Sequence, residues 1–507
     1  MQFLKQSINF NGMRSKRRVF VNINTLNPLF LVIFVSYTLY MDIQEILIKA
    51  AQLIASLAFL VTIHEFGHFI PARLFKTKVE KFYLFFNPYF SLFRYRKVNG
   101  KKRYAWFTKE TPKDWEDGSD KTEWGIGWLP LGGYVKIAGM IDESMDKEQM
   151  AQPAKSYEFR TKKPWQRLII MIGGVTVNLI AGFIIYGAIA WYWGGATLTT
   201  SKLTQGMAIH PYLAKYDVRS GDVITKVNGE EVTSFDDINR GLLLRNKTTL
   251  TLSRKGKILI RKLPATIDQE LFQHGAMSVA SFRVISESAG TITPGGFAEK
   301  AGMKNGDKII SINGAEIKYF DDIQLSLYGK RNKKADVLVL RGSDSIMIHS
   351  KVTPEGTIGF ASKNQFTSDT LALSKVQYTL GESMSKGIVG GTQLLRDYVA
   401  QFKFVFTKKG ATSVGGFTRI GDMFAPVWDW KVFWFNTAFL SFALAFMNIL
   451  PIPALDGGHV VFLLYEWITG KEAPQKILEY AQYIGFFLLL GLMIYANGND
   501  LIQLLIK

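Results

Sequence analysis

The residues best suited to chemistry form a five-residue cluster, His64-Glu65-Phe66-Gly67-His68. Positions i and i+4 of a helix lie only ~40° apart, so both imidazoles would share one helix face. They could take two corners of a tetrahedral zinc site, where zinc lowers the pKa of a bound water to ~7. Glu65 would lie beside that water and could accept its proton. The pattern predicts His64 and His68 as metal ligands and Glu65 as the general base.

A catalytic zinc site needs a third protein ligand beside its water, and the chain has no cysteine to supply it. Asp456 follows Pro451 and Pro453, which stop a helix, and precedes Gly457 and Gly458, which permit close backbone approach. Alone, such an aspartate would more often cap a helix. Combined with the histidine pair it is predicted to be the third ligand. His459 is the competing ligand, although a structural or outer-shell role suits it better.

Four apolar segments approach the ~20 residues that a membrane-spanning helix needs, namely 46–70, 168–193, 432–450 and 478–496. The histidine cluster lies near the end of the first. Ionisable groups inside a membrane are costly, about 2.5–3.5 kcal/mol for a central charge, and usually functional. A helix end with snorkelling side chains would not explain the four-residue histidine spacing. A fifth run, 26–40, is short, so residues 1–40 are predicted to be dispensable, with Met41 as an alternative start and a short extra span as the competing interpretation.

The net charge is +19, and many of the basic residues gather between positions 73 and 103. Nucleic-acid binding is one explanation of such a charge, but cytoplasmic loops of membrane proteins also collect Lys and Arg. We therefore expect no nucleic-acid partner. By the positive-inside rule, residues 71–165 are predicted to be cytoplasmic and residues 200–365 extracytoplasmic.

Residues 200–365 contain an internal repeat with a constant offset of 85 residues. Gly-Asp at 221–222, Asn-Gly at 228–229 and Phe-Asp-Asp-Ile at 235–238 recur at 306–307, 313–314 and 320–323. Each Asn-Gly supplies a positive-φ turn between strands. Two tandem modules of one fold are predicted.

These motifs together resemble the site-2 protease family. The resemblance rests on H-E-F-G-H in a first span and N-x-x-P-x-P-x-L-D-G-G, residues 448–458, in a later one. The tandem insert resembles PDZ domains, which narrows the resemblance to the bacterial regulator of sigma-E protease type. The segments 127–136 and 163–167 also match, and the resemblance runs from about Met41 to the C terminus.

The resemblance implies an intramembrane zinc metalloprotease with His64, His68 and Asp456 on zinc and Glu65 as general base. It implies that Asn448 helps to bind substrate, and that residues 128–137 form a membrane-dipping β-hairpin that takes the cleaved segment as an added strand. The substrate-binding residues expected there are Gly132, Gly133, Tyr134 and Val135. An ordinary cytoplasmic turn is the alternative for this segment.

The expected fold is a polytopic α-helical membrane protein of about four spans with a tandem PDZ-like α/β insert. Its predicted parts are an N-terminal extension (1–40), a first membrane part (41–199), two PDZ-like domains (200–285 and 286–365), an amphipathic linker (366–431) and a second membrane part (432–507). The PDZ-like pair could capture peptides or exclude bulky substrates.

The expected activity is hydrolysis of peptide bonds in transmembrane segments, at the bacterial inner membrane and with the PDZ-like domains periplasmic. Anti-sigma factors and signal-peptide remnants are the substrate classes that the resemblance suggests. The rival functions are a non-enzymatic membrane scaffold that presents the PDZ-like pair, and a zinc transporter. The transporter would call for facing ionisable residues along the spans, which are nearly free of them outside the site.

Overall fold

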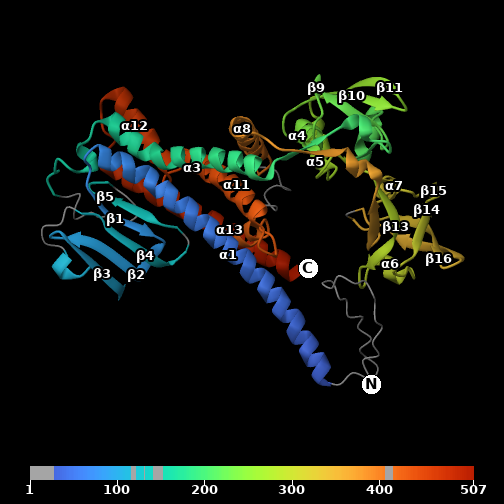
Figure 1. The fold of residues 1–507 in the computed structure, drawn as a ribbon, viewed down its shortest axis with the longest axis horizontal. Coiled ribbons are helices and arrows are strands. Elements are labelled where there is room, and N and C mark those ends of the chain that lie inside the picture. The colour runs from blue at the N-terminus through green and yellow to red at the C-terminus, as the bar shows by residue number, and fades with distance from the viewer. Residues whose placement is uncertain are drawn as a thin grey trace. The chain divides into compact units, whose positions relative to one another are not determined.

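The structure, a computed structural model, describes residues 28–115, 121–130, 132–140, 152–354, 356–405 and 415–506 (Figure 1). The chain divides into two compact units, which are described separately. The membrane unit comprises Met1–Tyr186 with Lys408–Lys507, and the second unit comprises Gly187–Thr407.

The membrane unit is built on long apolar helices. They are α1 (Pro28–Leu74), α3 (Pro164–Trp193), α11 (Trp430–Ile449) and α13 (Gln475–Ile506), joined by the shorter α10 (Phe417–Gly421) and α12 (Asp456–Thr469). Among the described residues, four stretches are long and apolar enough to cross a membrane: Ile43–Leu74, Pro164–Trp193, Trp430–Ile449 and Lys476–Ile502. The predicted set of four spans is confirmed.

Helix α1 runs without interruption through Met41, where the sequence suggested a fresh segment. Its 47 residues correspond to a length of ~70 Å, well beyond one membrane thickness. Residues 1–27 of the predicted extension lie outside the described part of the chain. The later start at Met41 stays a prediction.

Helices α1 and α3 cross at two glycines. A Cβ atom on Gly173 would lie 1.9 Å from the Gly67 carbonyl oxygen, and one on Gly67 would lie 2.4 Å from the Gly173 oxygen. Small residues allow such close backbone contact between membrane helices. Gly67 of the histidine cluster therefore lets α3 approach the catalytic face of α1.

A five-stranded sheet connects α1 to α3, in the order β3-β2-β4-β1-β5. Its strands are β1 (Val79–Leu84), β2 (Phe86–Val98), β3 (Lys101–Thr108), β4 (Glu123–Leu129) and β5 (Tyr134–Ile137). The prediction of a hairpin over 128–137 is wrong, because β4 and β5 do not pair with each other. Strand β1 lies between them, parallel to β4 and antiparallel to β5. Strand β5 thereby becomes an edge strand.

The second unit contains two modules with the same strand order. The sheet β11-β10-β8-β9 of the first corresponds to β17-β16-β14-β15 of the second. The strands and helices of the first are β8 (Val223–Val227), β9 (Glu230–Glu231), α4 (Phe235–Leu243), β10 (Thr249–Arg254), β11 (Lys257–Lys262) and α5 (Ile267–Gln273). Those of the second are α6 (Phe297–Lys300), β14 (Lys308–Ile312), β15 (Ala315–Glu316), α7 (Phe320–Leu327), β16 (Lys334–Arg341) and β17 (Asp344–Lys351).

Two-stranded pairs complete these modules, and each module has its own hydrophobic core. The paired strands are β7 (Met207–Ile209) with β12 (Ala280–Phe282), and β13 (Val284–Ile292) with β18 (Phe360–Phe366). Both Asn-Gly turns adopt the expected positive φ, 50° at Asn228 and 50° at Asn313. The predicted tandem repeat is confirmed in its topology.

The edges of this unit differ from the predicted domain boundaries. Leu198 and Ala372, which lie outside 200–285, belong to the core of the first module. Strand β6 (Gly195–Leu198) pairs with β19 (Leu373–Val376), so the predicted amphipathic linker begins as a strand before the helix α8 (Leu380–Val405). The strand forms there because its partner is supplied by residues nearly 180 positions earlier, which local spacing cannot reveal.

Each module contains an equivalent ion pair between a buried aspartate and a partly exposed arginine. Asp222 accepts from Arg254 Nε at 2.7 Å, and Asp307 accepts from Arg341 Nε at 2.8 Å. Burial alone would raise the pKa of Asp307, but hydrogen bonds from Arg341 and from the Lys304 backbone outweigh it and lower the pKa.

We expect Arg341→Met to destabilise the second module by about 3 kcal/mol, because it leaves a buried carboxylate unpaired. Since the folded pKa of Asp307 is lowered, its contribution is present at neutral pH and is lost as pH falls below ~4. Hydrogen exchange of β14 and β16 in the full chain measures both effects, with the exposed Arg331→Met as control. If Arg341→Met reduced the hydrogen-exchange protection of β14 and β16 by as much in acid as at neutral pH, this account would be contradicted.

Candidate metal centre

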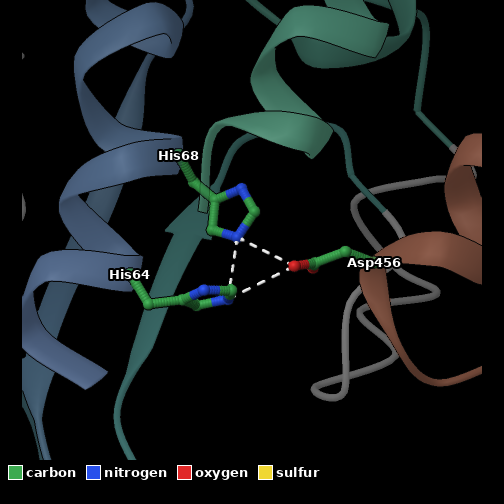
Figure 2. A group of neighbouring side chains, drawn as sticks. All are labelled: His64, His68 and Asp456. Atoms are coloured by element: carbon green, nitrogen blue, oxygen red, sulfur yellow. Dashed lines mark hydrogen bonds and ion pairs between the residues drawn. The ribbon is translucent and has the colours of Figure 1, made fainter. Parts of the chain in front are cut away.

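Three predicted ligands converge from distant parts of the sequence (Figure 2). His64 Nε2 and His68 Nε2 lie 3.2 Å and 3.4 Å from Asp456 Oδ2, and 3.2 Å from each other. All three side chains are largely buried. Among the described residues this is the group of His, Cys, Asp and Glu side chains that could hold a metal ion, and His459 does not belong to it.

The break between α11 and α12 delivers Asp456 to the histidines. Helix α11 ends at Ile449, and α12 begins at Asp456 itself. A Cβ atom on Gly457 would lie 2.1 Å from the Leu450 carbonyl oxygen, so only glycine lets the chain fold back here. At the other end of α12, Glu466 forms a buried ion pair with Arg167 of α3. The helix carrying Asp456 is thus held at both ends.

The donor atoms fit a zinc ion. Asp456 Oδ2 is buried without a hydrogen-bond donor, and it faces two imidazole nitrogens. Gly174 leaves the space for the cluster, since a Cβ atom there would lie 2.5 Å from both His64 Cε1 and His68 Nε2. His68 Nδ1 lies 2.8 Å from the Ile170 carbonyl oxygen, which fixes the proton on Nδ1 and leaves Nε2 free to bind a metal.

Asn178 of α3 is a site residue that sequence reasoning missed. Its side chain is buried with Nδ2 3.3 Å from His64 Nδ1, while Ser441 of α11 donates to its backbone oxygen at 2.6 Å. A metal-binding Nε2 requires the proton on Nδ1, so zinc binding calls for the amide to be turned so that its oxygen faces His64. As placed, Asn178 Oδ1 has no hydrogen-bond partner among the described residues. A lone asparagine inside an apolar span was the signal available in the sequence.

We expect Asn178→Ala to weaken zinc binding by ~10–100-fold, because His64 loses the partner that orients its ring. Competition with a fluorescent zinc chelator measures the affinity. Thr176→Ala is the matched control, since Thr176 is an exposed residue of the same helix. Equal affinities for both variants would show that Asn178 serves packing alone.

Glu65 and Asn448 also reach this centre. The Glu65 carboxylate lies close to the backbone of Val135 in β5 and to both histidines. Asn448 Nδ2 lies 3.3 Å from His64 Nε2. The edge strand β5 and the proposed base are therefore direct neighbours.

The glycines before β5 explain how this strand reaches α1. A Cβ atom on Gly133 would lie 2.5 Å from the Tyr83 carbonyl oxygen and 3.0 Å from Val61 of α1. Tyr134 stacks on Tyr83 with the ring centroids 5.2 Å apart. Of the predicted substrate-binding residues, Val135 lies at the centre, whereas Gly132, Gly133 and Tyr134 position the strand.

Comparison with known proteins decides the family. The family model of peptidase family M50 matches residues 52–107 and 111–492, most of the chain. The chain belongs to peptidase family M50. With its four apolar helices, this membership makes it an intramembrane zinc metalloprotease, as predicted from the sequence. The scaffold and transporter alternatives are thereby set aside.

Individual M50 relatives match along almost their whole length. A Vibrio cholerae protein named "Putative zinc metalloprotease" is 25% identical over 485 residues, covering 91% of this chain and 100% of the relative. The "Regulator of sigma E protease" of Haemophilus influenzae is 24% identical over 474 residues, covering 89% and 98%. The similarity therefore includes the second unit as well as the membrane helices.

Proposed function

We propose that His64, His68 and Asp456 hold the zinc ion of this protease and that Glu65 is its general base. The observation that carries the proposal is the convergence of three ligand atoms, all within 4.8 Å of one another, inside apolar helices. Zinc bound there would make a water nucleophilic at neutral pH and polarise the peptide carbonyl. The protein's own contribution is to hold the ligands and to move the proton.

Glu65 accepts the proton of the attacking water and returns it to the leaving amine. The carboxylate lies beside β5, close to the backbone of Val135. A substrate strand added beside β5, the edge strand of the described sheet, would run past the base with its peptide bonds extended, where a helix would hide them. Asn448, next to His64, would hold the scissile carbonyl by its side-chain amide.

The substrates are transmembrane segments of membrane proteins, such as anti-sigma factors or signal-peptide remnants. The basic loop after the first span supports a cytoplasmic sheet and a periplasmic second unit in a bacterial inner membrane. We further propose that the two α/β modules, each with a four-stranded sheet and its own core, are PDZ-like domains. We propose that they exclude bulky substrates, because no proposed catalytic residue lies between 200 and 365.

Deleting residues 200–365, with a short Gly/Ser linker joining the ends, should leave zinc bound and accelerate cleavage of substrates that keep a large outer domain. Cleavage of one substrate with and without that domain measures the effect in the same membranes. The full chain should reject the bulky form and the deletion should cleave both. If the deletion also rejects the bulky form, the filter lies elsewhere, for example in α8.

A further inference from the structure

One face of the sheet in the membrane unit is apolar across four strands. Residues paired between neighbouring strands share a face. The register pairs Tyr104 with Tyr95, Tyr95 with Trp124, and Trp124 with Phe82. These four side chains form a row that crosses β3, β2, β4 and β1.

Helix α1 covers one end of this row. The ring centroids of Phe66 and Phe82 are 4.7 Å apart, and those of Phe69 and Trp124 are 5.3 Å apart. Phe66 and Phe69 belong to the first apolar span, Ile43–Leu74. The apolar face therefore packs onto a membrane-spanning segment at the depth of its last two turns.

The same face continues past α1, where no described element packs over it. Its outer part, called here the aromatic patch, comprises Phe93, Tyr95, Tyr104, Trp106 and Ile126. Trp106 is 65% exposed, Tyr104 56% and Ile126 38%. The rings pack on one another, with Phe93 4.7 Å from Trp106 and Tyr95 5.2 Å from Tyr104 between centroids. An exposed apolar surface adjoining a membrane span is suited to lipid.

Basic residues border the aromatic patch at the β2–β3 turn. Lys97 and Lys102 pair with each other and continue the same face beyond Tyr95 and Tyr104. Asn99 and Gly100 form the tight turn with positive φ, and the exposed Lys101 follows it. Aromatic side chains followed by lysine and arginine are the arrangement found at the headgroup level of anionic membranes.

We propose that the β2–β3 hairpin is a lipid-docking element. The aromatic patch inserts into the interface of the leaflet beside α1, and the basic turn binds the phosphates of anionic lipids. Aromatic and basic residues also combine on surfaces that bind single-stranded nucleic acid. The continuity of this face with the one that packs on α1 favours lipid. The proposal does not depend on the peptidase activity.

The absence of cysteine makes the full chain suitable for single-site nitroxide labels. Tyr104→Cys places a label on the patch, and Arg103→Cys places one on the opposite face of the same strand. The labelled chains are reconstituted in nanodiscs of phosphatidylglycerol or of phosphatidylcholine. Paramagnetic accessibility then compares dissolved oxygen, which enters lipid, with a water-soluble nickel complex.

In phosphatidylglycerol the label at residue 104 should lose accessibility to the nickel complex and gain it to oxygen, while the label at 103 stays aqueous. Lys101→Glu with Lys102→Glu, or phosphatidylcholine, should return residue 104 to water. Equal accessibilities of the labels at 103 and 104 would overturn the proposal. So would the same insertion of residue 104 in phosphatidylglycerol and in phosphatidylcholine, or a loss of nickel accessibility that occurs only when an oligonucleotide is added. Unchanged zinc content in every variant verifies that the membrane unit is folded.

Discussion

Glu65→Gln should abolish cleavage while leaving the zinc content unchanged. General-base catalysis contributes ~10²–10⁴-fold to a rate, and the glutamine cannot accept the proton. The amide keeps the size of the carboxylate, so the packing between α1 and β5 should survive. The measurement is the initial rate of cleavage of a transmembrane peptide in reconstituted membranes, with zinc determined on the same sample.

Glu45→Gln makes the same chemical change at an exposed position of the same helix. It should cleave at the wild-type rate. If Glu65→Gln also cleaves at that rate, another group takes the proton, and the assignment of Glu65 is wrong.

Asp456→Ala should reduce zinc affinity by more than the ~10–100-fold expected for loss of an outer-shell partner, because it removes one of three protein ligands. Activity should disappear with the metal. Zinc content after dialysis against a weak chelator measures the effect. Asp422→Ala is the matched control, since Asp422 is 64% exposed on the membrane unit and pairs with Lys49 at 3.0 Å.

His459→Ala tests which of the two candidates for the third ligand, Asp456 or His459, binds the zinc. His459 lies in α12 but outside the three-residue cluster, so this variant should keep its zinc. If Asp456→Ala retained its zinc and His459→Ala lost it, His459 rather than Asp456 would be the third zinc ligand.

Periodicity and motif spacing predicted the parts of this protein that depend on local sequence. The histidines of α1 share a face because they are four residues apart, and Asp456 was recognisable as a carboxylate between prolines and glycines. Their convergence did not follow from spacing, because it depends on tertiary packing: α1 and α3 cross at Gly67 and Gly173, and Arg167 of α3 pairs with Glu466 in the helix that carries Asp456. The chemical need for a third zinc ligand was what linked Asp456 to histidines almost 400 positions earlier in the chain.

The error over 128–137 has a physical cause. The hairpin was what the family resemblance implied, and it agreed with the tendency of strands adjacent in sequence to pair. Instead β1, which packs on α1 through Phe82, occupies the position between them. Long-range packing overrode local pairing, and as a result β5 is the edge strand of the described sheet beside Glu65. Asn178 was missed for a similar reason, since only the tertiary structure places it on His64.

The central claim is that the cluster of His64, His68 and Asp456 holds the zinc on which peptide cleavage depends. The most direct test measures zinc and cleavage of a transmembrane peptide on one purified sample, before and after chelation and after zinc is added back. We predict one zinc ion per chain, loss of cleavage on chelation, and recovery on addition of zinc in the wild type but not in Asp456→Ala. Cleavage that persists in metal-free protein would contradict the account.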